Sequence, residues 1–331
     1  MTLIRSTFAL ASALAFALSA QSAAPAGAPP THTASTTKPR PNAKSKPALR
    51  PTPADIIKGS AAADWRALDP DNTLVMEVGG KTVIFELAPR FAPRHAANIR
   101  TLARDHYFDG LAVIRVQDNF VTQWGDPVDD EKEPEKLKPL GSALTQLPAE
   151  FSVPYKGLAL SPLRDADGYA PVTGFANGIP VAAHPKRNLA WIPHCYGVIG
   201  AGRGATVDSS NGSSLYVIIG QAPRALDLNI TVVGRVIKGM EHLAALPRGT
   251  AAMGFYETPE QRTPIQTVRL LGDLPEAQRP QLEVMRTDTP TWSTLVESRR
   301  HATGNWYVHS AEHINVCNIS VPTRPIAKPA P

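Results

Sequence analysis

Residues 108–127 read FDGLAVIRVQDNFVTQWGDP, and this stretch indicates more about the fold than any other part of the chain. An Asp-Gly pair and an Asp-Asn pair, both common in turns, each precede a short apolar run. The pattern predicts two adjacent strands, 111–116 and 120–124. Regular alternation along the first strand sends Arg115 to the same face as Val113.

Strand-like segments of similar length continue on both sides of this stretch. They are residues 74–78, 81–87, 196–201, 214–219, 232–237 and 266–271. Gly79 and Gly80 predict a two-residue hairpin turn, because glycine accepts a positive φ at no steric cost. Residues 93–104 predict a helix with proline in its first turn. The pattern predicts an all-β fold, a closed eight-stranded antiparallel barrel capped by two helices.

The order of these motifs resembles that of one known family. Four blocks, residues 83–100, 108–127, 197–218 and 226–240, are similar in this order to the cyclophilin-type peptidyl-prolyl cis-trans isomerases. The resemblance runs from residue 74 to residue 271. It implies the cyclophilin barrel and the isomerase activity of that family.

Isomerising an X-Pro bond needs no nucleophile, metal or cofactor, because its barrier of about 20 kcal/mol comes from amide resonance that is lost as the bond twists. In the twisted state the proline nitrogen can accept a hydrogen bond, and a guanidinium is always charged and rich in donors. The resemblance places Arg115 in the catalytic position, Phe120 against the proline ring and Gln123 on the peptide backbone. Without the resemblance, Arg115 is interpreted as a solvated surface charge and Phe120 as barrel core.

The resemblance also implies a set of substrate-binding residues: Val121, Gly202, Arg203, Ser214, Tyr216, Leu226 and Ile230. Ser214, Ala225 and Ile230 stand where the family often has Gln, Trp, and His or Tyr, which implies a looser pocket and weak turnover. Tyr216 replaces a Phe and adds a hydroxyl that needs water or a partner. Trp124 replaces a Gly, and either plugs the barrel or packs beneath an insert.

The first 22 residues have the composition of a signal peptide, with Arg5, an apolar run over residues 8–18 and then small residues. Such a run is too short to cross about 30 Å of hydrocarbon. We therefore expect a cleaved leader, a periplasmic location and no stable membrane insertion. Residues 23–54 contain eight prolines and no acidic residue, a composition that predicts a disordered linker.

The distribution of charge does not indicate a nucleic-acid-binding protein. Six of the 34 Lys and Arg residues lie in the first 54 residues, which leaves 28 against 29 Asp and Glu. The basic excess therefore comes from the leader and linker, and the remainder is near neutral. We expect a monomer that binds proline-containing polypeptides and no nucleic acid.

The rest of the chain is predicted to comprise a cyclophilin-like domain, residues 55–272, and a C-terminal extension, residues 273–331. An insert at about residues 128–195 is longer than compact family members have, rich in Pro and Gly, and predicted to be irregular. The extension contains a predicted strand at 282–285 and a predicted helix near 291–300. We expect this small α/β tail to pack on the barrel.

Cys195 and Cys317 are the only cysteines of the chain. An even number of cysteines in an oxidising compartment favours one disulfide. The alternative is zinc, because His309, His313 and Cys317 have a spacing that would align three ligands on a helix. The apolar residues within 314–321 favour an extended chain instead, in which this alignment fails. Two unrelated buried thiols are the third alternative.

Sequence signatures of serine hydrolases, phosphate-binding loops and zinc proteases are absent from the chain. Two functions of different classes remain. The first is a peptidyl-prolyl isomerase that assists the folding of exported proteins, favoured by Arg115, Phe120 and Gln123. The second is a catalytically weak X-Pro-binding chaperone or scaffold module, which the residues at positions 214, 225 and 230 keep open.

Overall fold

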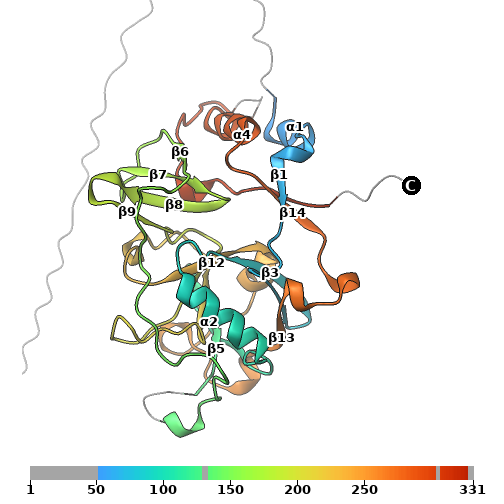
Figure 1. The fold of residues 1–331 in the computed structure, drawn as a ribbon, viewed down its shortest axis with the longest axis vertical. Coiled ribbons are helices and arrows are strands. Elements are labelled where there is room, and N and C mark those ends of the chain that lie inside the picture. The colour runs from blue at the N-terminus through green and yellow to red at the C-terminus, as the bar shows by residue number, and fades with distance from the viewer. Residues whose placement is uncertain (1–50, 129–132, 303–305, 327–331) are drawn as a thin grey trace, which may run out of the picture. The chain divides into compact units, whose positions relative to one another are not determined.

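Eight strands close into an antiparallel barrel in the order β10-β11-β5-β4-β13-β2-β3-β12 (Figure 1). The structure is a computed structural model that describes residues 51–128, 133–302 and 306–326. The barrel strands are β2 (Thr73–Val78), β3 (Lys81–Leu87), β4 (Ala112–Val116), β5 (Val121–Gly125), β10 (Val198–Ala201), β11 (Leu215–Ile218), β12 (Val232–Lys238) and β13 (Thr263–Leu270). The predicted fold class is confirmed. The predicted signal peptide and most of the predicted linker lie outside the described residues.

Local sequence explains how the barrel begins and what fills it. Gly79 and Gly80 join β2 to β3 with φ angles of 57° and 70°, which is the left-handed region that glycine accepts. Trp124 is 1% exposed, and its ring lies 6.3 Å from that of Phe85 inside the barrel. Of the two alternatives for Trp124, plugging the barrel is therefore the one observed.

Helix α2 (Pro93–Arg104) has the predicted bounds and packs beside the barrel, whereas α3 (Met240–Ala244) is a single short turn of helix. The first backbone N–H groups of α2 have no partner inside the helix. Glu150 from the insert accepts from the amides of Arg94 at 3.0 Å and His95 at 2.9 Å. It also lies 2.7 Å from the His95 ring nitrogen Nδ1. The insert is thus fixed at Glu150 to the barrel's main helix.

The prediction of an irregular insert is wrong for its second half. Four strands form an antiparallel sheet in the order β6-β7-β8-β9. They are β6 (Ser161–Leu163), β7 (Val172–Ala176), β8 (Ile179–His184) and β9 (Leu189–Trp191). Glycine content suggested irregularity, but in the sheet one of these glycines marks a turn: Asn177 and Gly178 join β7 to β8 with φ angles of 49° and 83°.

A third sheet combines residues from both ends of the described chain in the order β1-β14-β15. Its strands are β1 (Trp65–Ala67), β14 (Leu282–Met285) and β15 (Thr323–Pro325), and the helices α1 (Pro53–Lys58) and α4 (Pro290–Arg300) pair beside it. The strand and helix predicted in the C-terminal extension are both present. Helix α1 begins at Pro53, inside the segment that was predicted to be linker, because Thr52 provides a capping box for it.

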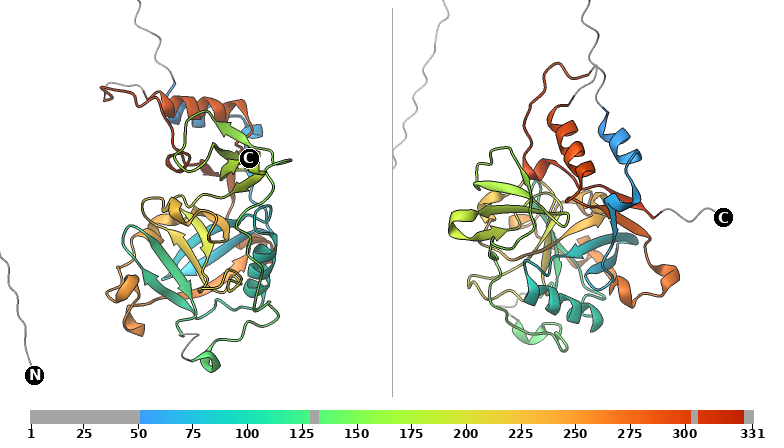
Figure 2. Two further views of the ribbon diagram at one scale, coloured as in Figure 1. Left: turned by 90° about the vertical axis from the view of Figure 1, so that its left-hand side faces the viewer. Right: turned by 45° about the horizontal axis from the view of Figure 1, so that its top comes forward.

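We call residues 53–67, 152–195, 282–302 and 306–325 together the accessory lobe. One apolar cluster joins the lobe to the outer face of the barrel, and in it Phe175 of the insert meets Trp292 of α4 edge to face at 5.0 Å. Figure 2 shows the helices of the lobe on its side away from the barrel. The extension is therefore part of a shared core with the insert.

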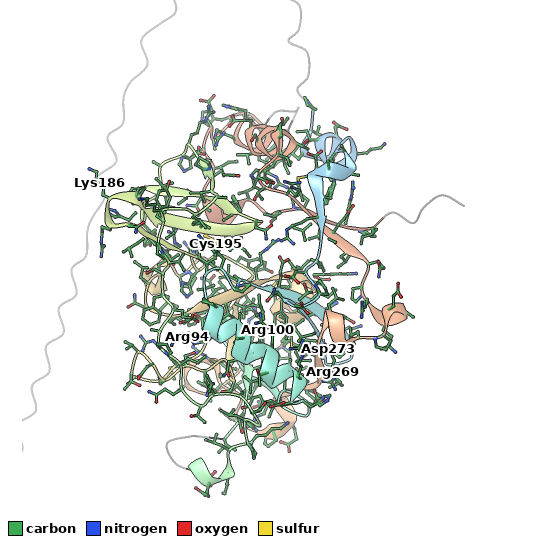
Figure 3. All side chains as sticks on the ribbon, viewed as in Figure 1. Arg94, Arg100, Lys186, Cys195, Arg269 and Asp273 are labelled. Carbon is green, nitrogen blue, oxygen red and sulfur yellow. A yellow bond between two sulfur atoms is a disulfide. The ribbon has the colours of Figure 1, made fainter. Side chains whose placement is uncertain are left out.

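A disulfide between Cys195 and Cys317 connects the end of the insert to the C-terminal extension, with an S–S distance of 2.06 Å. Figure 3 shows Cys195 where the insert meets the barrel. The zinc alternative needs Cys317 as a free ligand, and His309 and His313 lie in a segment without helix. The described residues contain no group of three or more His, Cys, Asp or Glu that could hold a metal ion. No described helix is long and apolar enough to span a bilayer.

Candidate active site

Three of the predicted site residues and one glycine form a row across four adjacent barrel strands. Gly200 on β10 pairs with Tyr216 on β11, Tyr216 pairs with Gln123 on β5, and Gln123 pairs with Arg115 on β4. Residues that are opposite each other in a sheet share a face. Because Trp124 next to Gln123 points into the barrel, the row lies on the outer surface of the barrel wall.

The prediction that Arg115 shares a face with Val113 is wrong. Val113 is opposite Trp124 and fully buried in the barrel, whereas Arg115 is opposite Gln123. The register shifts between the two residues, so Ile114 is an extra residue in β4, which is a β-bulge. The bulge reverses the alternation and turns Arg115 outward, as bulges beside active sites do.

The guanidinium of Arg115 is held by three acceptors. Its Nε donates to the carbonyl oxygen of Met253 at 2.7 Å, and one terminal nitrogen donates to Gln123 Oε1 at 3.2 Å. The other terminal nitrogen donates to Gln117 Oε1. Burial lowers the pKa of this guanidinium. An arginine has five N–H donors, so these bonds leave two N–H groups for a substrate.

Two aromatic rings flank the same guanidinium. Its central carbon lies 5.4 Å from the ring centroid of Phe120 and 5.4 Å from that of Phe255. Phe120 is half-buried and packs against the outer apolar cluster, so it does not belong to the barrel core. Sequence reasoning missed Gln117, Met253 and Phe255. No motif marks the loop that carries Met253 and Phe255. These two residues are found only because Phe255 pairs with Arg115 in the structure.

Gln123 connects Arg115 to the next strand. Its Nε2 donates to Ser214 Oγ at 3.1 Å, and the amide of Gly202 donates to the Ser214 carbonyl at 2.8 Å. A Cβ on Gly202 would lie 3.2 Å from Ser214 Oγ, so this position is close-packed as well as accessible. The structure thus brings Arg115, Gln123, Ser214 and Gly202 into one connected group.

The remaining predicted residues lie around this group. Tyr216 is 5% exposed and shares the outer apolar cluster with Val121, and Ile230 packs against that cluster. Leu226 is half-buried at the end of a short 3₁₀ helix. Arg203 does not point to Arg115: its Nε donates to the carbonyl oxygen of residue 229 at 2.9 Å, and its side chain holds two loops together.

The described surface also has grooves of about 840, 650 and 500 Å³. Residues of the accessory lobe contribute to the lining of each, and none of the predicted catalytic or substrate-binding residues lines any of them. These three grooves are therefore separate from the candidate site.

Residues 73–270 match the family model described as cyclophilin type peptidyl-prolyl cis-trans isomerase/CLD. This match starts at the first residue of β2 and ends at the last residue of β13, so it coincides with the barrel. The chain belongs to the cyclophilin-type peptidyl-prolyl cis-trans isomerases. Its enzyme class is that of the family, and the resemblance seen in the sequence is confirmed.

Known cyclophilins and isomerases are similar to much of this chain. A probable peptidyl-prolyl cis-trans isomerase of Brucella suis is 27% identical over 200 residues, which cover 59% of this chain and 82% of the relative. One of Brucella abortus is 26% identical with the same coverage. The crystal structure of cyclophilin AquaCyp293 from Hirschia baltica is similar over 78% of this chain and 92% of that chain, with a TM-score of 0.62 and 26% identity. That structural likeness covers a larger share of the chain than the 198 of 331 residues that match the family model.

Proposed function

We propose that the row centred on Arg115 is the isomerase site of this cyclophilin and acts on X-Pro bonds of exported polypeptides as they fold. The observation that carries the proposal is the setting of one guanidinium. Arg115 lies over the rings of Phe120 and Phe255, is oriented by three acceptors and keeps two N–H groups free. A solvated surface arginine would have no such fixed orientation.

In this mechanism no covalent bond forms or breaks. Arg115 donates to the proline nitrogen as the amide twists, when that nitrogen becomes an acceptor, and so favours the twisted state over the planar one. Gln123 holds the peptide backbone, and Phe120 with Val121 and Leu226 provides the apolar surface for the proline ring. Such preorganised donors lower the barrier because they need no reorganisation at the moment of reaction.

The proposed site of action is the periplasm, with a monomeric enzyme. The leader-like residues 1–22 and the disulfide between Cys195 and Cys317 support export to an oxidising compartment. The near balance of charge after residue 54 supports a polypeptide substrate over nucleic acid.

The test is an isomerisation assay on a short X-Pro peptide that compares wild type with Arg115→Ala. We expect Arg115→Ala to lower turnover at least about tenfold, which equals about 1.4 kcal/mol of transition-state stabilisation. Its melting temperature should stay near that of the wild type. Arg104→Ala is the control, because Arg104 is an exposed arginine that pairs with Asp273 at the end of α2.

Equal rates for wild type and Arg115→Ala would refute the assignment of the site. Wild type that binds the peptide but does not isomerise it would instead support the second function, an X-Pro-binding chaperone or scaffold module. Ser214, Ala225 and Ile230, which differ from the residues that the family often has at these positions, favour that outcome.

A further inference from the structure

The hydroxyl of Tyr216 is not available to a substrate. It lies 3.0 Å from Nε2 of His194, a fully buried residue at the end of the insert, and the two rings are nearly parallel. Burial raises the pKa of Tyr216, so the hydroxyl keeps its proton. The side chain of Tyr216, which belongs to the candidate pocket, is therefore hydrogen-bonded to the accessory lobe.

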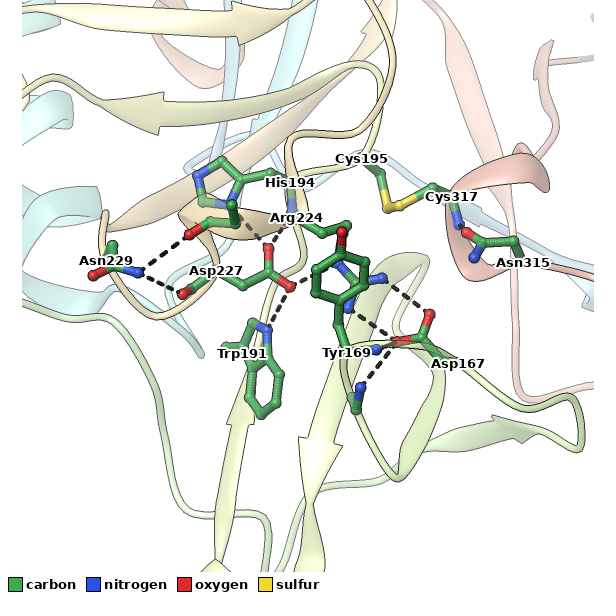
Figure 4. A network of polar contacts seen from close by, with 12 residues as sticks. Asp167, Tyr169, Trp191, His194, Cys195, Arg224, Asp227, Asn229, Asn315 and Cys317 are labelled. Atoms are coloured by element: carbon green, nitrogen blue, oxygen red, sulfur yellow. Dashed lines mark hydrogen bonds and ion pairs between the residues drawn. A yellow bond between two sulfur atoms is a disulfide. The ribbon is translucent and has the colours of Figure 1, made fainter.

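The other nitrogen of His194 is held by Asp227. The Asp227 Oδ1 atom lies 3.1 Å from His194 Nδ1 and accepts from the backbone amide of His194 at 3.0 Å (Figure 4). Because a carboxylate only accepts, Nδ1 is the donor, and a neutral ring then accepts the Tyr216 proton at Nε2. This arrangement fixes the tautomer and the orientation of the imidazole.

The same carboxylate joins the insert sheet to the loop that carries Leu226. Asp227 Oδ2 accepts from Trp191 Nε1 on β9 at 3.0 Å and from Arg224 Nε at 2.6 Å. Arg224 then donates both terminal nitrogens to Asp167 of the insert, at 3.0 and 3.2 Å, with both side chains buried. Leu226 lies between Arg224 and Asp227 in the sequence, so one network fixes both it and the Tyr216 ring.

Tyr216 needs such a support because its own neighbour on β10 is a glycine. A Cβ on Gly200 would lie 2.2 Å from Tyr216 Cζ, which shows that the ring lies directly over the Gly200 backbone. The ring therefore has no side chain beside it at this position of the strand. His194 from the insert provides the contact at the hydroxyl end instead.

From these contacts we infer that His194, Asp227 and Arg224 are positioning residues for the proline pocket, and that the insert sheet acts as its outer support. This inference rests on the proposed isomerase site and adds to it the part played by the accessory lobe. The network holds two pocket surfaces, Tyr216 and Leu226, in the geometry that receives the proline ring. A preorganised pocket binds more tightly because less ordering remains to be done on binding.

The test is a measurement of KM and kcat for a short X-Pro peptide with Tyr216→Phe, His194→Gln and the double variant. Tyr216→Phe removes one oxygen and keeps the ring, so it is the mildest way to break the contact. We expect each single variant to raise KM about fivefold, the effect of losing one neutral hydrogen bond, with kcat nearly unchanged. The double variant should be no worse than His194→Gln alone, because that variant has already lost the contact with the Tyr216 hydroxyl.

The matched control is His95→Gln. His95 is also fully buried and lies 2.7 Å from a carboxylate, Glu150, but it belongs to α2. It should lower the melting temperature and leave KM unchanged. If Tyr216→Phe and His194→Gln keep the wild-type KM while Arg115→Ala is impaired, the network is structural only and the inference fails. If Arg115→Ala is fully active, it is the proposed site that fails.

Discussion

Phe255 pairs with Arg115 as an isolated antiparallel bridge, and its ring lies 5.4 Å from the guanidinium carbon. The loop that carries Phe255 comes after α3, and its Met253 carbonyl oxygen accepts from Arg115 Nε. Cation–π contacts of this kind contribute about 0.5–2 kcal/mol, depending on exposure. The aromatic ring is therefore one of the devices that orient the arginine.

We expect Phe255→Leu to lower kcat/KM about threefold to tenfold, because the guanidinium loses one flanking ring but keeps its acceptors. Phe255→Tyr keeps the ring and should stay close to wild type. Steady-state assays on an X-Pro peptide check both. Similar losses in the two variants would show that the loop acts through its backbone, by the Met253 carbonyl, and not through the ring.

Gly200 should not tolerate a side chain. The Cβ of Gly200→Ala would lie 2.2 Å from Tyr216 Cζ, so the tyrosine ring has to move. We expect a loss of about 1–3 kcal/mol in the free energy of unfolding, as for other overpacked sites, together with a higher KM. In a Tyr216→Leu background the same substitution should cost less. Urea unfolding measures both costs. If Gly200→Ala lowers the free energy of unfolding equally with Tyr216 and with Leu at that position, the clash is not with the tyrosine ring.

The bond between Cys195 and Cys317 should account for a large share of the stability. It closes a loop with a sequence separation of 122 residues. For a loop of this size chain entropy gives about 4–5 kcal/mol, an upper figure because strain subtracts from it. The Cys195→Ser, Cys317→Ser double variant should therefore melt clearly lower. Titration of the denatured, unreduced wild type should find no free thiol, and two free thiols per chain would contradict the bond.

Acid should weaken the network around Asp227. Burial alone would raise the pKa of this carboxyl, but hydrogen bonds from His194, Trp191 and Arg224 outweigh it and hold the pKa below its ordinary value. A carboxyl with a lowered folded pKa stabilises the fold above about pH 4, and this contribution is lost as the pH falls through the folded pKa. Urea unfolding from pH 7 to pH 3 should show the difference between wild type and Asp227→Asn becoming smaller below about pH 4.

Asp71→Asn is the control for this experiment, because Asp71 is exposed. Its unfolding free energy should follow the wild type at every pH. A difference between wild type and Asp227→Asn that stays constant through the acid range would mean that the carboxylate charge of Asp227 contributes nothing.

The barrel could be predicted from the sequence because its signals are local. Two glycines mark the turn after β2, and α2 has the predicted bounds because its apolar residues recur with helical spacing. The outward position of Arg115 could not be derived from alternation. It depends on an extra residue, Ile114, which is visible only in the pairing of β4 with β5.

The supports of the site were beyond sequence reasoning for a different reason. Phe255 lies 140 positions after Arg115, and His194 lies 22 positions before Tyr216, without any motif to connect them. The need for a partner of the Tyr216 hydroxyl could be predicted, because a buried polar group costs free energy when it is unpaired. Which residue pairs with this hydroxyl depends on how the insert folds. The sheet of the insert was not predicted, because the segment is rich in glycine and proline.

The sheet of β1, β14 and β15 has a consequence for how the chain acquires its structure. Trp65 of β1 pairs with Met285 of β14. Strand β1 precedes all the barrel strands in the sequence, and β14 follows them all, so β1 can pair only after the barrel strands have been made. Domains generally begin to fold from their N-terminal side as synthesis proceeds. The barrel strands are all present once residue 270 has emerged, whereas the partner of β1 is still missing. Closure of the lobe thus requires that the chain has been made through β14, and a chain cut short before β14 would leave β1 without its partner strand.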